Sequence, residues 1–117
     1  ARFYHSGDAA EIGWIMARCW RFGNDALETG GIASREAFYR GYRSAATLPF
    51  DETIVPYWEI MAAAKWATVA VLQGDRYRKG GENSIELALT GLMPPEMELD
   101  ALDGIAALAA SGDPRWR

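Results

Sequence analysis

Residues 56–77 read PYWEIMAAAKWATVAVLQGDRY, and this stretch decides the fold. A helix tolerates proline in its first turn, so Pro56 can stand at the start. Either the helix begins near Thr53 with Pro56 in its first turn, or a short turn precedes it. Alanines in the middle let neighbouring helices approach closely, and Gly80-Gly81 ends the pattern. We predict a long central helix from Pro56 to about Tyr77.

The N-terminal segment also shows a helical pattern. Asp8 and Glu11 have the spacing of a capping box, which predicts a helix from about Asp8 to Phe22. The following segment Gly23–Gly31 has turn chemistry and predicts an acidic loop. The apolar residues of the predicted helix recur every three to four positions: Ile12, Trp14, Ile15, Cys19 and Trp20.

A second helix is predicted between this loop and the central helix. Ser34 is its predicted N-cap, and Glu36 lies in the first turn, where the helix dipole favours an anion. The helix should end at about Ala46, because proline disfavours helical geometry in the residue before it and Leu48-Pro49 follows. Asp51 then offers a new cap.

Two further helices are expected after the central one. Asn83 and Glu86 have capping-box spacing and open a short helix through Leu92. Pro94-Pro95 suits the start of a fifth helix, and residues 111–117 should be frayed. One face of the fifth helix is expected to hold the apolar residues Met97, Leu99, Leu102, Ile105 and Leu108.

No segment shows the strict alternation of a half-buried strand, so the predicted fold class is all-α, a bundle of about five helices around the long central helix. The 117 residues suffice for one domain with a core of its own. A net charge of −4 argues against a nucleic-acid or anionic-membrane surface. The apolar stretch Ile60–Leu72 carries Lys65 and is too short to span a bilayer. No leader pattern opens the chain, so we expect a cytoplasmic protein.

The residues taken alone form no self-sufficient catalytic constellation. His5, Asp8, Glu11, Asp25 and Glu28 are the candidate general bases, but a helix cap explains Asp8 and Glu11 together, and His5 is explained by an ordinary surface role. One histidine and one cysteine exclude a Cys/His zinc site built from this chain alone. Packing in the core is the favoured interpretation of Cys19 and of the helically spaced residues Trp14, Trp20, Trp58 and Trp66.

Residues 3–14, FYHSGDAAEIGW, resemble the segment that follows the metal-binding aspartate in aminoglycoside phosphotransferase-like and choline-kinase-like enzymes. The likeness spans about residues 1–109 and is strongest for bacterial phosphotransferases related to the kinase-like domain found beside acyl-CoA dehydrogenases. The resemblance depends on the order and spacing of several short motifs, rather than on any single motif. The remaining stretches that carry it are 17–23 (ARCWRFG), 31–42 with Ser34-Arg35-Glu36 and Phe38, 56–59 (PYWE), Trp66 and 84–88 (SIELA).

The resemblance implies that residues 1–110 are the C-terminal helical, acceptor-binding subdomain of an ATP- and Mg²⁺-dependent phosphotransferase with a protein-kinase-like fold. In that family a His-Gly-Asp loop, an asparagine and a magnesium-binding aspartate would precede Ala1, and the absence of an initiator Met fits a piece of a larger kinase. The chain alone would therefore bind neither ATP nor Mg²⁺, would hold no catalytic or metal-binding residue and would not catalyse the reaction. Its partners would be the missing N-terminal lobe and a small-molecule hydroxyl acceptor.

The acceptor-binding residues implied by this resemblance lie near the first helix and in the following loop: His5, Asp8, Asn24, Asp25 and Glu28. Antibiotic-modifying members bind ammonium groups through acidic residues of this subdomain. The long helix here carries Ala62-Ala63-Ala64 where those members tend to carry an acidic pair, so an aminoglycoside is not favoured. A small hydroxylated metabolite or an acyl-linked hydroxyl fits at least as well. Ala9 replaces a usual proline, and Ala1-Arg2 stands in place of Trp-Glu.

Two alternatives remain open. The chain could be a free-standing all-α binding or oligomerisation module with no phosphotransfer role, or it could belong to a degenerate kinase. In isolation, Trp and Leu side chains that would face a missing lobe are left exposed, which offers a surface for a homodimer.

Overall fold

The computed structural model describes residues 2–47 and 49–116, with side chains from Asp8 onward. The described part is all-α, as predicted, and contains no strand beyond an isolated bridge between Thr29 and Ala33. None of its helices is both long and apolar enough to cross a membrane. The α-helices are α1 (Arg2–Met16), α2 (Arg35–Ala45), α3 (Val55–Arg78), α4 (Ile85–Thr90) and α5 (Pro94–Ala110), with short 3-10 helices η1 (Arg18–Trp20), η2 (Glu52–Ile54) and η3 (Pro114–Trp116).

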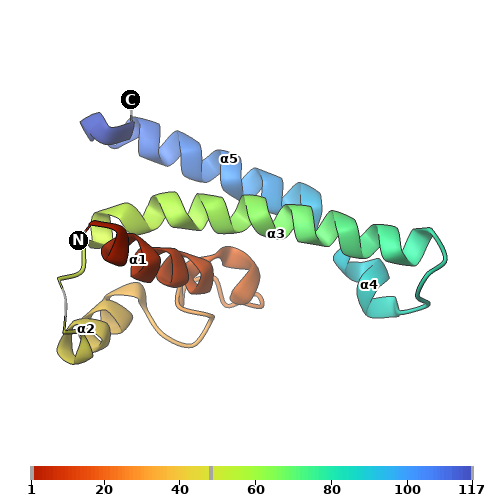
Figure 1. Ribbon diagram of the computed structural model, residues 1–117, viewed down its shortest axis with the longest axis horizontal. Helices are drawn as coiled ribbons and strands as arrows, with labels where there is room; N and C mark the ends of the chain where they lie inside the picture. Colours follow the sequence, from red (N-terminus) through yellow and green to blue (C-terminus); the bar gives the residue numbers. More distant parts are fainter. Residues whose placement is uncertain (1, 48, 117) are drawn as a thin grey trace.

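The predicted long helix is the centre of the arrangement. Figure 1 shows α3 running the length of the molecule, with α5 antiparallel along one side and α1 along another. α4 packs near the end of α3, and α2 lies beyond α1. The prediction of about five helices around a central one is therefore confirmed.

The ends of α2 and α3 follow the predicted chemistry. The Ser34 hydroxyl accepts a hydrogen bond from the Ala37 backbone N–H at 3.1 Å and caps α2. A short turn precedes α3, because Asp51 accepts from the Thr53 N–H at 3.0 Å and so caps η2. The chain leaves α3 through Gly80, which has a φ of +81°, a backbone conformation that glycine adopts more readily than other residues.

Two predicted capping boxes are wrong. α1 begins at Arg2, so Asp8 lies inside the helix, where the backbone N–H groups are already paired. That helix ends at Met16 rather than Phe22, because Ala17 takes an extended ψ of 138°. In α4 the N-cap position is Ser84, one residue after Asn83, and no side-chain cap forms there.

Two apolar clusters build the core. The first joins α1, α2 and the start of α3 through Ala9, Ile12, Met16, Tyr39 and Val55. The second joins α3 to α5 through Ala67, Ala70 and Met97, with Cys19, Trp66 and Met93 packed against it. Small residues on α3 thus allow the close approach that the sequence predicted.

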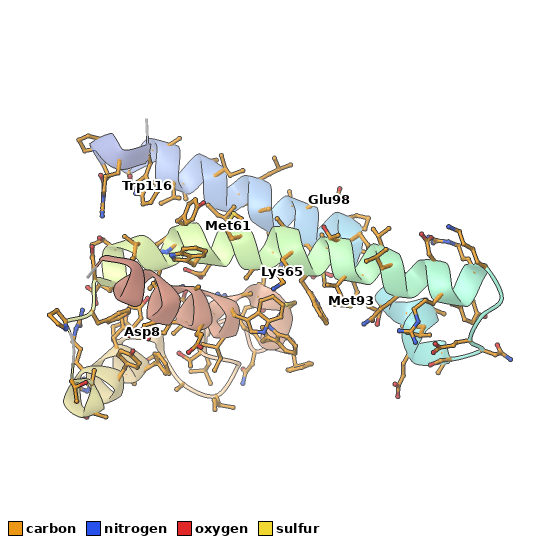
Figure 2. All side chains as sticks on the ribbon, viewed as in Figure 1. Asp8, Met61, Lys65, Met93, Glu98 and Trp116 are labelled. Atoms are coloured by element: carbon orange, nitrogen blue, oxygen red, sulfur yellow. The ribbon has the colours of Figure 1, made fainter. Side chains whose placement is uncertain are left out.

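The tryptophans pack against one another, as expected. Trp14, Trp20 and Trp66 form a cluster with ring centroids 5.4–5.9 Å apart, and all three are half-buried. Lys65, labelled on α3 in Figure 2, covers the Trp14 ring at 5.7 Å. The cluster fixes the end of α1 and η1 against the middle of α3.

The predicted apolar face of α5 is wrong. Met97 is buried, but Leu99, Leu102 and Ile105 are 54%, 62% and 53% exposed. α5 instead turns a stripe of smaller residues toward α3, and a Cβ on Gly104 would lie only 2.6 Å from Ile60 Cγ1. Close helix approach through small residues has displaced the larger side chains outward.

The C-terminal residues pack onto α3, which differs from the expected fraying. Trp116, labelled in Figure 2, stacks on Tyr57 with centroids 5.6 Å apart and planes 9° apart. Arg115 Nη2 donates to Thr53 Oγ1 at 2.9 Å. Residue 117 lies outside the described residues.

Candidate functional site

A cleft of about 960 Å³ opens between α5, the first half of α3 and the segment from η1 to the start of α2. We call it the α5 cleft. Its apolar floor comes from α3 and α5 and includes Pro56, Ile60, Ala63, Ala107 and Leu108. Its charged wall comes from three arginines and five carboxylates, which sum to a formal charge of −2: Arg18, Arg21 and Arg35 against Asp25, Glu52, Glu59, Asp100 and Asp103.

The loop that forms one wall is shaped by its own polar residues. Asn24 Nδ2 donates to the Gly31 carbonyl at 2.9 Å. The buried Thr29 hydroxyl donates to the Ser34 carbonyl at 3.3 Å. Gly31 has φ +77°, and a Cβ there would lie 2.5 Å from the Arg21 carbonyl oxygen, so only glycine fits this crossing.

Arg35 is the most strongly held side chain of the wall. Its Nη2 bonds to Glu28 at 2.6 Å and to Glu59 at 2.7 Å, and its Nη1 donates to the Tyr39 hydroxyl at 3.1 Å. Burial by itself would lower the pKa of Arg35, but the hydrogen bonds to Glu59 and Glu28 outweigh it and raise that pKa. Arg35 therefore ties the loop and α2 to α3.

Arg18 links the loop to α5. Its Nη1 donates to Asp100 at 3.1 Å, and its Nε donates to Asp25 at 3.3 Å. The pKa of Arg18 is raised, first by the hydrogen bond to Asp100. Because Arg18 is 44% exposed, this contact positions the mouth of the cleft more than it stabilises the fold.

Arg21 lies deeper than Arg18. Its Nη2 donates to the Met16 carbonyl at 2.9 Å, and its Nη1 donates to the Asp25 carbonyl at 3.3 Å. Its buried Nε finds no hydrogen-bond acceptor among the described residues. Ion pairs of the three arginines thus join the segments of the wall, whereas Asp103 lines the cleft without an ion pair among the described residues.

The lining of the α5 cleft determines which ligand groups it can bind. Carboxylate oxygens accept hydrogen bonds from hydroxyl or ammonium groups, and the apolar floor suits a carbon skeleton. The part of the chain described from residue 8 onward brings no three His, Cys, Asp or Glu side chains together as a metal site would need.

The predicted site residues are only partly brought together. Asn24, Asp25 and Glu28 share the loop, Asp25 lines the α5 cleft, and Glu28 pairs with Arg35. Asp8, labelled on α1 in Figure 2, lines a separate hollow of about 270 Å³ beside Tyr42. The His5 side chain lies outside the described residues.

Sequence reasoning missed the contribution of α5. Asp100 and Asp103 lie on one side of this helix, one turn apart, and both line the cleft. Their acidic stripe, with Glu96 one turn earlier, was the signal that could have found them. Arg35 and Glu59 carried the family resemblance, but nothing in the sequence indicated that they pair across 24 residues.

Comparison with known proteins adds no relative: no family model, no curated protein and no solved structure matches the chain. The likeness to phosphotransferases therefore rests on the sequence motifs alone.

Proposed function

We propose that this chain is the acceptor-binding part of a cytoplasmic, ATP- and Mg²⁺-dependent small-molecule phosphotransferase. The α5 cleft carries the proposal. It has the size of a small-molecule site, an apolar floor and carboxylates on the wall. ATP and Mg²⁺ would be held by parts of the enzyme outside this chain.

The role of the cleft residues would be to position the acceptor. The floor at Ile60 and Ala107 would seat the carbon skeleton, and Asp103 would accept a hydrogen bond from an acceptor hydroxyl. Arg18 and Arg35 would keep the wall in place through their paired carboxylates. Fixing a hydroxyl toward a phosphoryl donor removes much of the entropic cost of a two-substrate reaction.

A binding module without phosphotransfer is the second candidate. The observation in its favour is that both core clusters are built from residues of this chain. Such a module would use the same cleft but would need no catalytic lobe. The coding sequence upstream of Ala1 separates the two: His-Gly-Asp, asparagine and aspartate codons support the phosphotransferase, and a start codon there contradicts it.

Ligand binding can be measured directly on this chain. Amide NMR spectra would be recorded while polyols, hydroxy acids and 3-hydroxyacyl pantetheine thioesters are titrated in. We expect shifts at residues of the α5 cleft, and a several-fold weaker affinity in Asp103→Asn. Glu86→Gln, on α4 and outside the cleft, is the matched control. Shifts confined to other surfaces, or equal affinities in the three proteins, would refute the assignment of the cleft.

A further inference from the structure

A second cavity adjoins the α5 cleft beside the start of α5. Its volume of about 430 Å³ lies within the range of small-molecule sites. We call it the methionine pocket, because Met93, labelled in Figure 2, and Met97 both line it. The other uncharged residues of its lining come from η1 and the turn that follows: Cys19, Phe22 and Gly23.

The charged residues of the methionine pocket form one ion-pair network. Arg18 lies at its centre, and its guanidinium nitrogens pair with oxygens of three carboxylates: Asp25 at 3.3 Å, Glu96 at 3.8 Å and Asp100 at 3.1 Å. All of these residues except Glu96 also line the α5 cleft. The network is therefore a partition between the two cavities.

This partition is weakly held. The side chains of Arg18, Asp25 and Glu96 are 44%, 52% and 63% exposed. Ion pairs in contact with solvent contribute little free energy, so the Arg18 side chain can turn aside at small cost. A ligand bound in the α5 cleft can therefore extend past Arg18 into the methionine pocket.

The lining beyond the partition suits a hydrocarbon chain. Met93 and Met97 stand one turn apart and so lie on the same side of the start of α5. Methionine side chains are unbranched and flexible, and they adapt to apolar groups of different shape. Outside the Arg18 network, the described residues bring no charged side chain to this pocket.

Phe22 lines this pocket at an energetic cost. Its φ of +50° lies in the left-handed region, which is unfavourable for a bulky side chain. Phe22 is 82% exposed, and its ring packs edge-on against Trp20 with centroids 6.5 Å apart. Because an exposed ring contributes little to the core, stability does not account for the strained backbone. Backbone strain of this kind is typical of ligand-binding positions, here a ring that an apolar ligand would cover.

We propose that the methionine pocket binds an apolar chain of the same acceptor whose hydroxyl group occupies the α5 cleft. The preferred substrates are therefore hydroxyl compounds with a hydrocarbon tail, and Phe22 is a specificity-determining residue. This inference rests on the proposed function, since it takes the α5 cleft as the acceptor site. The two remain separable, because Asp103 lines only the α5 cleft and Phe22 only the methionine pocket.

NMR spectra of the chain with carbon-13-labelled methionine methyl groups locate the tail. The probes are 1,2-alkanediols from butane-1,2-diol to octane-1,2-diol, which share one head group. We expect octane-1,2-diol to shift the signals of Met93 and Met97, and butane-1,2-diol to leave them in place. Met16 and Met61 line neither cavity and are internal controls. Tail-dependent shifts confined to Met16 or Met61, or no such shifts, would overturn the proposal.

Affinities along the same series measure burial of the tail. Each methylene group buried in the pocket should strengthen binding about three- to fourfold. Phe22→Gly should reduce this gain for the longer diols while stability changes little, because glycine adopts φ +50° without strain. Ile32→Ala is the matched control: Ile32 is 83% exposed, also lies between η1 and α2, and lines neither cavity. A Phe22 with a purely structural role would lose stability on substitution and leave the gain unchanged.

Met93→Gln keeps the proposal testable if Phe22→Gly alters the fold, which circular dichroism would detect. The amide has nearly the length of the methionine side chain but loses hydrogen bonds to water beside a hydrocarbon tail, so the gain per methylene group should fall in this variant too. Asp103→Asn should instead weaken the binding of butane-1,2-diol and octane-1,2-diol alike.

The three variants distinguish the two proposals. Binding that depends on Asp103, with a gain per methylene group that Phe22→Gly and Met93→Gln leave unchanged, would overturn this inference and leave the proposed function standing. Binding that depends on Phe22 and Met93 but not on Asp103 would overturn the proposed function, and with it the shared ligand. Binding of no diol would overturn both.

Discussion

Gly13 of α1 and Trp58 of α3 meet backbone to backbone. A Cβ atom on Gly13 would lie 2.5 Å from Trp58 Cβ and 2.7 Å from the Trp58 carbonyl carbon. The neighbouring backbone N of Glu59 would be 2.9 Å away. This contact sets the spacing of α1 and α3 directly behind the Glu59 side chain that holds Arg35.

Gly13→Ala should therefore destabilise the protein although alanine is the better helix former. The added methyl group meets backbone atoms that cannot turn aside, and overpacking of this kind costs about 1–3 kcal/mol. Gly41→Ala is the matched control, because Gly41 lies inside α2 with nothing within 4 Å of its added Cβ. The control should gain about 0.5–1 kcal/mol. Urea unfolding of the two variants checks the prediction, and a gain in both would contradict the contact.

Replacement of Arg35 should be among the most damaging single changes in the wall of the cleft. Arg35→Met leaves Glu59 without an ion pair among the described residues and leaves Glu28 with only Arg21, 3.7 Å away. The Arg35 and Glu59 side chains are only 19% and 20% exposed. Breaking such a pair should cost about 2–3 kcal/mol, below the range for full burial. Arg76→Met removes the exposed pair with Glu82 and should cost less than about 1 kcal/mol. Thermal unfolding compares the stability of Arg35→Met with that of Arg76→Met. Equal losses of stability in the two variants would exclude a role of Arg35 in holding the loop and α2 against α3.

Local signals predicted the elements of the fold well. The position of Pro56, the cap at Ser34 and the glycines after Arg78 each act within one or two turns, so the sequence alone placed α2 and α3 to within about two residues. The α5 stripe failed because two stripes of this helix are apolar. Which one is buried depends on the close approach of Gly104 to Ile60, a contact between distant residues.

The candidate site was predicted less completely. The acidic loop was found from its composition, and Asp25 does line the cleft. Asp100 and Asp103 were not found, because only the antiparallel return of α5 along α3 brings them opposite this loop. Pairing across 82 residues, as between Arg18 and Asp100, leaves no local pattern in a sequence.

Glu28 should make stability depend on acid pH. The hydrogen bond from Arg35 holds the pKa of Glu28 below its ordinary value. A depressed folded-state pKa contributes stability above the unfolded pKa, about 4.3, and that contribution is lost as the pH falls through the folded value. The stability difference between wild type and Glu28→Gln should thus be largest at neutral pH and shrink as the pH falls below the unfolded pKa.

Urea unfolding between pH 2.5 and 7 measures this difference. Asp51, Asp75 and Asp113 also have lowered pKa values, but they are present in both proteins and cancel in the comparison. Glu11→Gln, at an exposed site on α1 without an ion pair among the described residues, is the matched control. A profile for Glu28→Gln that matches this control would mean that the bond to Arg35 does not persist in solution.

Cys19 should be a slow nucleophile in the folded protein. Burial raises the pKa of its thiol from 9.0 to about 11, and the residue packs beside the second core cluster. Only the thiolate attacks a disulfide reagent, so two pKa steps reduce the rate at pH 8 about a hundredfold. The rate of Cys19 labelling by an aromatic disulfide is measured in buffer, where the protein is folded, and in denaturant, where it is unfolded. If the folded thiol reacts directly, its rate rises about tenfold per pH unit up to about 11. A rate that instead follows the urea concentration at fixed pH reports local opening of η1, and labelling as fast as in denaturant would show that Cys19 is not packed in the core.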